Sequence, residues 1–314
     1  MLHPQQICTE EINRLLQVGE AQRSTGPLSE SRQLAALNRA YSKLNALAQG
    51  HEHPDLLDYV NLDLYNDSTG LLDQPFPMRA HSMVALAERL TTIPSREEVN
   101  AVITHRRNGT SYYAGSSDIT YCTKYEVLMR KFYVRQPRNT TNFRLWYMKD
   151  LPSLHYSLVW EDQVSSQNLL YMRTSPTQGK FDFRSDIYIG QLVYIYAGAG
   201  IGTMGKIASM ERQDSDCYIA TCESLDSIES PDTPFTEALD DTSRYTLLPW
   251  FPASFYSYLA MEGACFFTMN DGAQLLVPQK EEHKVKFEDF VTPYDPSNTQ
   301  GIIPNFGSDL GLEY

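Results

Sequence analysis

The sequence has 314 residues, of which 42% are hydrophobic and 21% charged, and its formal net charge is −13. This length supports one large or two smaller domains with a buried core, and the composition excludes a disordered or fibrous chain. The acidic balance argues against a general nucleic-acid-binding surface, because phosphate binding requires concentrated Lys and Arg.

Charge is distributed unevenly along the chain. Residues 96–149 contain ten Lys or Arg and four Asp or Glu, whereas residues 209–245 contain ten Asp or Glu and two Arg. Two interpretations stay open. The segments form solvated faces of opposite sign, or they form complementary patches through which copies of the chain stack head to tail.

The cysteines and the first residues indicate the cellular compartment. Five cysteines without a CxxC pair are typical of reduced thiols in a cytoplasmic protein. The start, MLHPQQICTEEINRLL, lacks the basic stretch and apolar core of a secretory signal. We therefore expect synthesis in the cytoplasm and no association with a membrane.

The first 50 residues predict two helices. In PQQICTEEINRLLQVG, Pro4 suits a first helical turn and Gly19 a position just after the helix. In LSESRQLAALNRAYSKLNALAQG, apolar side chains recur every three or four residues, a spacing typical of packing between neighbouring helices. We expect this second helix to stabilise a helical bundle through Leu34, Leu37, Tyr41 and Leu44.

From about Leu56 the sequence consists of short runs of β-branched and aromatic residues. YVNLDLY, NAVITHR, TYCTKYEVLMRKFYV and NFRLWYM predict a β-rich layer, whereas MRAHSMVALAERL fits a helix or a strand. NLLYMRT, IYIGQLVYIYAG, GKIASMERQ and DCYIATCESL predict a second group of strands. We therefore predict a first domain, 1–164, with helices and a β-rich layer, and an inserted β-domain, 165–248.

The last part of the chain predicts a helix followed by a tail. PWFPASFYSYLAMEGACFFTMNDG indicates a helix, within 249–274, that returns to the bundle. Four prolines and three glycines in 275–314 favour an extended tail. Its spaced apolar residues are typical of a segment that orders on a partner, although it could also wrap its own domain. The predicted docking anchors are Phe287, Phe290, Tyr294, Ile302, Ile303, Phe306 and Tyr314.

Gly200–Gly205, with the sequence GIGTMG, matches the dinucleotide-binding fingerprint GxGxxG. That site requires a helix directly after the glycines, whose amides hold the pyrophosphate. Here only KIASMERQ precedes the next turn-forming residues, which is too short for such a unit. We predict instead a hairpin corner formed by Gly198, Gly200, Gly202 and Gly205, and a nucleotide-binding enzyme remains a remote alternative.

Other catalytic and metal-binding patterns are missing from the sequence. It contains no GK[S/T], HExxH, GxSxG or CxxC motif. His51 and His53 form an HxH pair without a third ligand nearby. We therefore expect no catalysis, no cofactor and no metal.

Several segments carry a resemblance to a known family. These are the helices EEINRLL and LNRAYSKLN, the strands ending in RLWYMKDLPSLHYSLV, the late helix FPASFYSYLAMEGACFF and the segment DFRSDIYIGQLVYIYAGAGIGTMGKIASME. Their order resembles the head-to-tail adaptor (connector or neck) proteins of tailed bacteriophages, and the last segment is similar to a β-domain of such proteins.

The resemblance implies an α+β fold. Its parts would be an N-terminal helical bundle with a β-rich extension, an inserted β-barrel- or sandwich-like domain, a late helix and an extended C-terminal tail. It also implies a structural virion protein at the head–tail junction, which forms a dodecameric ring beneath the portal. The tail would dock onto the portal, and tail, nozzle or tail-tube proteins would bind on the other side.

In that setting DNA would pass through the ring without specific binding, because an acidic lining repels phosphates. The basic segment 96–149 would then face neighbouring subunits or the portal. The alternatives are another phage neck or tail component, or a β-protein that binds a receptor or a carbohydrate.

Overall fold

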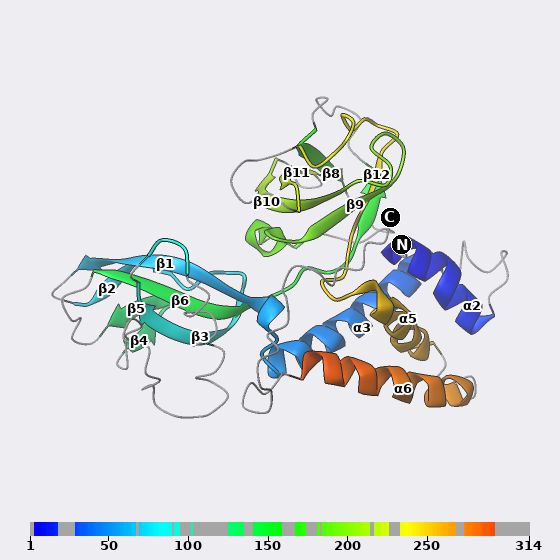
Figure 1. Cartoon of the computed structure of the whole chain (residues 1–314), viewed down its shortest axis with the longest axis horizontal. Coiled ribbons are helices and arrows are strands. Elements are labelled where there is room, and N and C mark those ends of the chain that lie inside the picture. Colours follow the sequence, from blue (N-terminus) through cyan, green and yellow to red (C-terminus); the bar gives the residue numbers. More distant parts are fainter. Residues whose placement is uncertain are drawn as a thin grey trace, which may run out of the picture. The chain divides into compact units, whose positions relative to one another are not determined.

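The computed structural model describes residues 3–17, 29–66, 69–89, 91–94, 102, 125–134, 141–158, 167–173, 181–182, 184–213, 217–225, 233–267 and 273–292. The chain divides into two compact units (Figure 1). Unit 1 combines Met1–His51 with Pro152–Tyr314, and unit 2 is Glu52–Leu151. Helices and strands are both abundant, so the fold is of the α+β kind that the sequence predicts.

A helical run opens unit 1 and consists of α1 (Pro4–Gln6), the π-helix η1 (Ile7–Ile12) and α2 (Asn13–Leu16). Its wide π turn leaves two main-chain carbonyls within reach of one side chain. The side-chain amide of Asn13 donates to the carbonyls of Cys8 (3.2 Å) and Thr9 (2.6 Å). Gln33 donates to the Asn13 side chain at 2.7 Å. This buried pair joins the first helical run to the following helix.

The long helix α3 (Glu30–Gly50) forms where the apolar spacing predicts it. α5 (Tyr256–Cys265) packs against α3, and a Cβ added at Gly263 would lie 3.5 Å from the Leu37 Cα. The glycine therefore allows a close approach of the two helix backbones. The four predicted packing positions lie on the buried face of α3: Leu34, Leu37, Tyr41 and Leu44.

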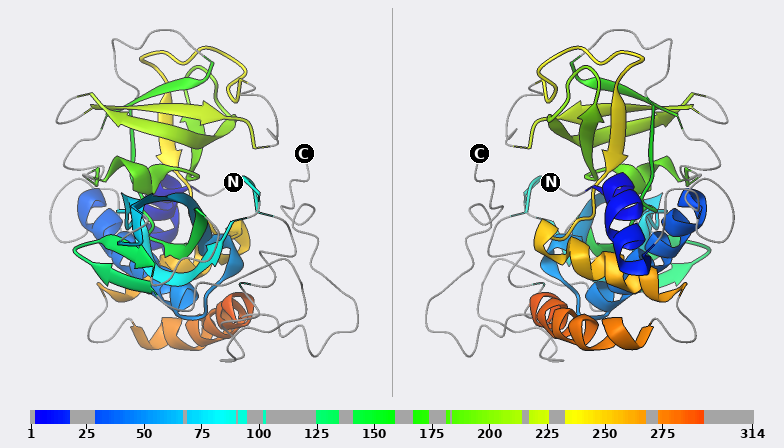
Figure 2. Two further views of the ribbon diagram at one scale, coloured as in Figure 1. Left: turned by 90° about the vertical axis from the view of Figure 1, so that its left-hand side faces the viewer. Right: turned by 90° about the vertical axis from the view of Figure 1, so that its right-hand side faces the viewer.

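α6 (Ala273–Val291) corrects the prediction of an extended tail from residue 275. Figure 2 shows α6 as a regular helix, and it packs against α3 and α5. Phe287 and Val291, one helical turn apart, are fully buried. Two i,i+4 Lys–Glu ion pairs also stabilise the helix. The prediction gave too much weight to Pro278, which lies in the second turn and removes one main-chain hydrogen bond.

Unit 2 contains a six-stranded antiparallel sheet in the order β3-β6-β1-β2-β5-β4. Its strands are β1 (Leu57–Asn66), β2 (Leu71–Pro75), β3 (Ala80–Glu88), β4 (Tyr125–Leu128), β5 (Lys131–Val134) and β6 (Asn142–Lys149). The short 3-10 helix η3 (Pro54–Leu56) precedes β1. The segment MRAHSMVALAERL, which fitted a helix or a strand, contains strand β3.

Strand β6, between β3 and β1, is buried on both faces of this sheet. One face carries an apolar core with Leu62, Leu86, Phe132, Phe143, Leu145 and Tyr147. The other face holds Arg144, whose side chain is fully buried. Its Nε donates to Asn61 Oδ1 (3.0 Å), and its Nη2 donates to the carbonyls of Thr91 (2.6 Å) and Thr92 (2.9 Å). The guanidinium therefore fastens the segment after β3 to the sheet.

Unit 1 contains the second six-stranded antiparallel sheet, in the order β7-β12-β9-β10-β11-β8. Its strands are β7 (Tyr156–Leu158), β8 (Leu169–Arg173), β9 (Leu192–Ala197), β10 (Met204–Arg212), β11 (Cys217–Glu223) and β12 (Arg244–Leu247). The 3-10 helix η4 (Ser185–Tyr188) lies between β8 and β9 in the chain, and η5 (Ala253–Phe255) follows β12.

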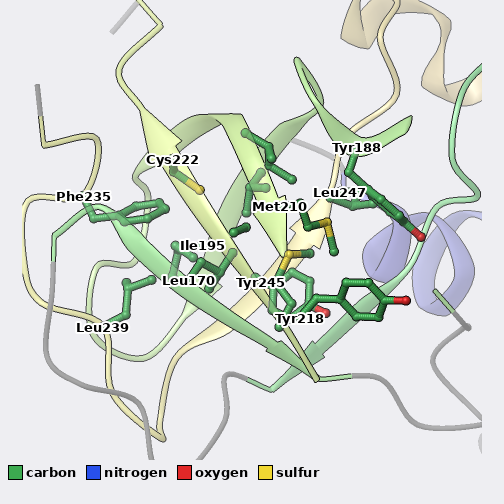
Figure 3. Close-up of a cluster of buried hydrophobic side chains, with 14 of the residues drawn as sticks. Leu170, Tyr188, Ile195, Met210, Tyr218, Cys222, Phe235, Leu239, Tyr245 and Leu247 are labelled. Carbon is green, nitrogen blue, oxygen red and sulfur yellow. The ribbon is translucent and has the colours of Figure 1, made fainter. Parts of the chain in front are cut away.

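This second sheet curls into a half-barrel, because its two edge strands, β7 and β8, contact each other. Figure 3 shows the side chains that fill its interior, which come from the strands, from η4 and from the chain between β11 and β12. Among them are Leu170, Ile195, Met210, Phe235, Tyr245 and Leu247. The alternating apolar residues of these strands therefore supply one continuous core.

Polar contacts join the helices of unit 1 to its sheet. The Asn38 side chain donates to the Leu154 carbonyl (2.9 Å) and accepts from the Leu154 amide (2.7 Å). The Tyr156 hydroxyl donates to Glu30 at 2.6 Å. The chain entering β7 is thus held against α3.

The two units divide the chain differently from the predicted domains. The prediction combined the helices and the first β-rich layer in 1–164, whereas the structure separates Glu52–Leu151 as a unit of its own. The chain from Pro152 belongs to unit 1, since β7 pairs with β12. Strands β8 to β12 all lie within the predicted range 165–248. Sequence patterns indicate strands, but they do not show which strand a short segment pairs with.

Candidate interaction surfaces

The glycine motif lies at the tip of the β9–β10 hairpin. Gly198, Gly200 and Gly202 have φ values of 79°, 73° and 84°, which glycine adopts without a steric penalty. Gly205 lies in β10, where an added Cβ would be 3.1 Å from the Pro234 side chain. The glycines lead into a nine-residue strand paired antiparallel with β9. The helix that a dinucleotide fingerprint requires is therefore replaced by a strand.

The neighbouring segment 237–243 holds this turn in one conformation. The Ser243 hydroxyl donates to the Ala199 carbonyl (2.9 Å), and the Ala199 amide donates to Thr242 Oγ1 (3.3 Å). A Cβ added at Gly198 would lie only 2.2 Å from the Thr242 carbonyl oxygen. At the tip, the Ile201 side chain is left 63% exposed.

Exposed carboxylates lie on the segment that holds this turn, and one of them, Glu237, accepts a hydrogen bond from the Gly200 amide (3.5 Å). Glu237, Asp240 and Asp241 are all exposed. A hydrogen bond from the Thr242 hydroxyl (2.6 Å) holds the pKa of the Asp240 carboxyl below its usual value. Arg244 is half-buried and donates to the Thr242 carbonyl at 2.8 Å. The acidic turn surface is defined here as Ile201, Glu237, Asp240 and Asp241.

A second turn, in unit 2, was missed by sequence reasoning. Leu128 pairs with Lys131, so β4 and β5 are joined by the two residues Met129 and Arg130. Their φ values are 50° and 63°, the left-handed conformation of a type I′ hairpin turn. Arg130 accepts from the Phe76 amide (2.6 Å) and donates through Nη2 to the Phe76 carbonyl (2.9 Å).

Apolar side chains are exposed along this turn. Val127, Leu128 and Met129 are 49%, 60% and 89% exposed, and Met78, two residues after Phe76, is 47% exposed. The signal in the sequence was the apolar run VLM directly before two cations in YEVLMRKFYV. The hairpin tip is defined here as Met78, Val127, Leu128, Met129, Arg130 and Lys131.

A buried ion cluster joins the three helices of unit 1. Glu262 of α5 is 3% exposed and lies 3.0 Å from Lys43 of α3 and 3.3 Å from Lys280 of α6. The Tyr258 hydroxyl donates to it at 3.1 Å. Burial alone would raise the pKa of Glu262, but the hydrogen bond and charge of Lys43, together with Lys280, leave it below its usual value. The carboxylate thus stabilises the packing of α3, α5 and α6.

Two predicted docking anchors pack within their own unit. Phe287 is fully buried, with its ring centroid 5.4 Å from Phe251, and Phe290 stacks on Trp250 at 5.9 Å. These aromatic contacts are the ones that an amphipathic helix makes with its own domain. A docking role for Phe287 is therefore wrong, since its side chain is not accessible. The other predicted anchors lie outside the described residues: Tyr294, Ile302, Ile303, Phe306 and Tyr314.

The described residues offer little metal or thiol chemistry. No group of three or more His, Cys, Asp or Glu side chains gathers among them in a metal-binding arrangement. Burial raises the pKa of the Cys222 thiol to about 12 and also raises that of Cys8, which keeps both thiols protonated at neutral pH. In the part of the chain that the structure describes, no helix has the length and apolar character that a membrane crossing needs.

Comparison with known proteins gives no relative: no family model, no curated protein and no solved structure matches this chain.

Proposed function

We propose that this chain is a structural virion protein, a head-to-tail adaptor that forms a dodecameric ring between the portal and the tail and lets DNA pass. The observation that carries the proposal is the order of its parts. In unit 1, α3 packs with α5 and α6, and both β-sheets are contributed by the chain between α3 and α5. A helical core with β extensions is the arrangement that the sequence resemblance to adaptors implies.

The exposed apolar surface supports an assembly role, whereas the buried charged groups serve the fold. Arg144 and Glu262, both buried, bind main-chain carbonyls or lysines of neighbouring elements and so hold the fold together. The most exposed apolar side chain among the described residues, Met129, lies on a hairpin in unit 2. Exposed apolar patches of this kind mark surfaces that bind other proteins.

Within this proposal each part has a task. The helices of unit 1 form the body of each subunit, and the acidic net charge of −13 keeps the ring from retaining DNA. Tyr294, Ile302, Ile303, Phe306 and Tyr314 dock onto the portal, as the sequence predicts. The β-sheets contact neighbouring subunits and tail components.

The test is binding to portal rings from the phage whose genome encodes this chain. We expect the full chain to decorate those rings in negative-stain images and to raise their mass. A chain that ends at Thr292 retains α6 and its buried Phe287, so it should fold and fail to bind. Failure of the full chain to bind would overturn the proposal, and full binding by the shortened chain would remove the predicted tail anchors from it.

A further inference from the structure

Exposed apolar surface is concentrated at the hairpin tip. Val127, Leu128 and Met129 are consecutive, and Met78 follows two residues after Phe76, which exchanges two hydrogen bonds with Arg130. The remaining large apolar side chains exposed among the described residues are dispersed over different elements: Tyr65, Ile93, Ile201, Phe266 and Val285. Single exposed residues are normal, whereas a contiguous patch indicates a contact.

The hairpin tip also lies at the edge of its sheet. β4 is the last strand in the order, and among the described residues only β5 pairs with it. An exposed apolar edge strand is prone to contact another chain, and natural proteins usually protect it. The position and the composition of the tip therefore both indicate a contact with another chain.

The conformation of the turn is a third observation. Asn-Gly is the favoured pair for a type I′ turn, because both residues need positive φ. Met129 and Arg130 adopt φ values of 50° and 63° instead, and Met129 is 89% exposed. Strain of this kind at a residue without internal packing is typical of a functional contact.

The charges of the tip select its partner. Arg130 and Lys131 are exposed next to the apolar run, with Glu126 as the nearby acid. The acidic turn surface has the complementary character, since it combines exposed Ile201 with the exposed Glu237, Asp240 and Asp241 of the segment that bonds the same turn. We infer that the hairpin tip of one copy docks onto the acidic turn surface of a second copy of this chain.

This contact is heterologous, because it joins two different surfaces, and repetition of it closes a ring or extends a filament. The inference rests on the proposed function in that a ring is the assembly it would build. Met129 would pack against Ile201, and Lys131 would lie opposite Asp241. Their burial supplies the affinity and the charges supply the orientation.

Two charge-reversal variants of the full chain, studied alone and as a mixture, test the contact. Lys131→Glu and Asp241→Lys, each alone, should weaken self-association about tenfold or more, measured as mass against concentration, because each places like charges together. An equimolar mixture of the two variants should regain association, since the altered tip of one faces the altered surface of the other. Restoration in the mixture shows that both variants are folded.

A second variant removes the apolar contact and relaxes the turn. M129N/R130G should fold at least as well as the original chain and lose about tenfold or more in self-association. Ile93→Ser is the matched control, because it removes an isoleucine that is 75% exposed elsewhere in unit 2, and it should associate normally. A photo-crosslinker placed at position 129 should join to the segment around Ile201 of another copy.

The inference is overturned if the chain stays monomeric at the highest soluble concentration, if both charge variants associate normally, or if the crosslinks map elsewhere. The two proposals fail separately. If rings bind the portal and both charge variants associate normally, the adaptor function is retained and this contact is excluded. Charge-dependent self-association without portal binding would keep the contact and remove the adaptor function.

Discussion

The β9–β10 turn of unit 1 and the β4–β5 turn of unit 2 both require residues with positive φ, but they use different residue types. Glycine occupies each such position in the first turn, at Gly198, Gly200 and Gly202. Met129 and Arg130 occupy them in the second. The left-handed conformation costs a non-glycine residue about 1–2 kcal/mol, so the second turn is strained and the first is not.

The two turns also differ in what surrounds them. The first is fixed by hydrogen bonds to Thr242 and Ser243, whereas the second is held at Phe76 and exposes its side chains. The first turn is therefore adapted to its backbone shape, whereas the second accepts strain and exposes its side chains. Substitutions in the two turns, and in the two sheets that carry them, should therefore have different effects.

The largest effect is expected in unit 2 from Arg144→Met. The substitution removes the donor to the Asn61 side-chain oxygen and to the Thr91 carbonyl, whereas the Thr92 carbonyl keeps a hydrogen bond from Asn61 Nδ2 (3.0 Å). We expect unit 2 to lose about 3 kcal/mol of unfolding free energy, and Arg144→Lys to rescue little, because a lysine cannot form the guanidinium fork. Hydrogen exchange of amides in each unit measures this. Equal loss of protection in both units would show that they do not unfold separately.

In unit 1, two glycine-to-alanine substitutions distinguish the cost of a steric clash from the cost of a positive φ. Gly198→Ala adds a Cβ 2.2 Å from the Thr242 carbonyl and should cost more than about 2 kcal/mol, because the backbone has to shift. Gly202→Ala meets no atom within 4 Å and should cost about 1 kcal/mol, from its φ of 84° alone. Denaturant unfolding of the two variants checks the order. Equal costs would mean that segment 237–243 does not hold the turn.

The sheet of unit 1 should also respond to pH. His155 lies edge-on to the rings of Phe181 (4.7 Å) and Tyr245 (5.7 Å), and burial lowers its pKa to about 3. In the unfolded chain its pKa is about 6.5. Above that value the residue is neutral in both states. As the pH falls from about 6.5 towards 3, only the unfolded state gains a proton, so stability is lost.

The expected slope is up to about 1.4 kcal/mol per pH unit from this residue. His155→Phe, which keeps an aromatic ring and cannot titrate, should flatten the fall in unfolding free energy between pH 6 and 4 by up to that amount. Urea unfolding at several pH values measures it. Burial also lowers the pKa of His3, to about 4, so His3→Phe is the matched variant. An unchanged slope in His155→Phe would assign the pH dependence to other groups.

Much of the fold can be predicted from spacing alone. The helix from Glu30 to Gly50, most strands of both sheets and the hairpin at Gly200–Gly205 follow from apolar periodicity and from turn residues. Such local patterns are informative because they reflect which face of an element is buried. The short strand β7 and its pairing with β12 could not be predicted, because pairing depends on segments distant in the sequence.

The features that carry function were harder to predict. Arg144 stands in the run NFRLWYM, where alternation favours a solvent-facing side chain, yet it is fully buried because carbonyls converge on it. Phe287 was assigned to a partner because spacing shows that a residue is apolar but not which surface covers it. Met129 and Arg130 are poor turn formers, so residue type does not predict the β4–β5 turn, and only the apolar run VLM before two cations marks the segment.

The smallest expected effect is a gain in stability, and it tests the difference between the two turns directly. M129N/R130G gives the β4–β5 turn the residues that a type I′ conformation favours, and it removes a methionine side chain that is 89% exposed. Since φ values of 50° and 63° are strained for Met and Arg, we expect unit 2 to gain about 1 kcal/mol, measured by denaturant unfolding. Loss of the Arg130 bond to the Phe76 carbonyl offsets part of this gain. Met129→Asn alone, which keeps that bond, should therefore also stabilise the unit. A loss of stability in both variants would mean that Met129 and Arg130 serve the fold itself, and the contrast with the glycine turn would then no longer indicate a contact surface.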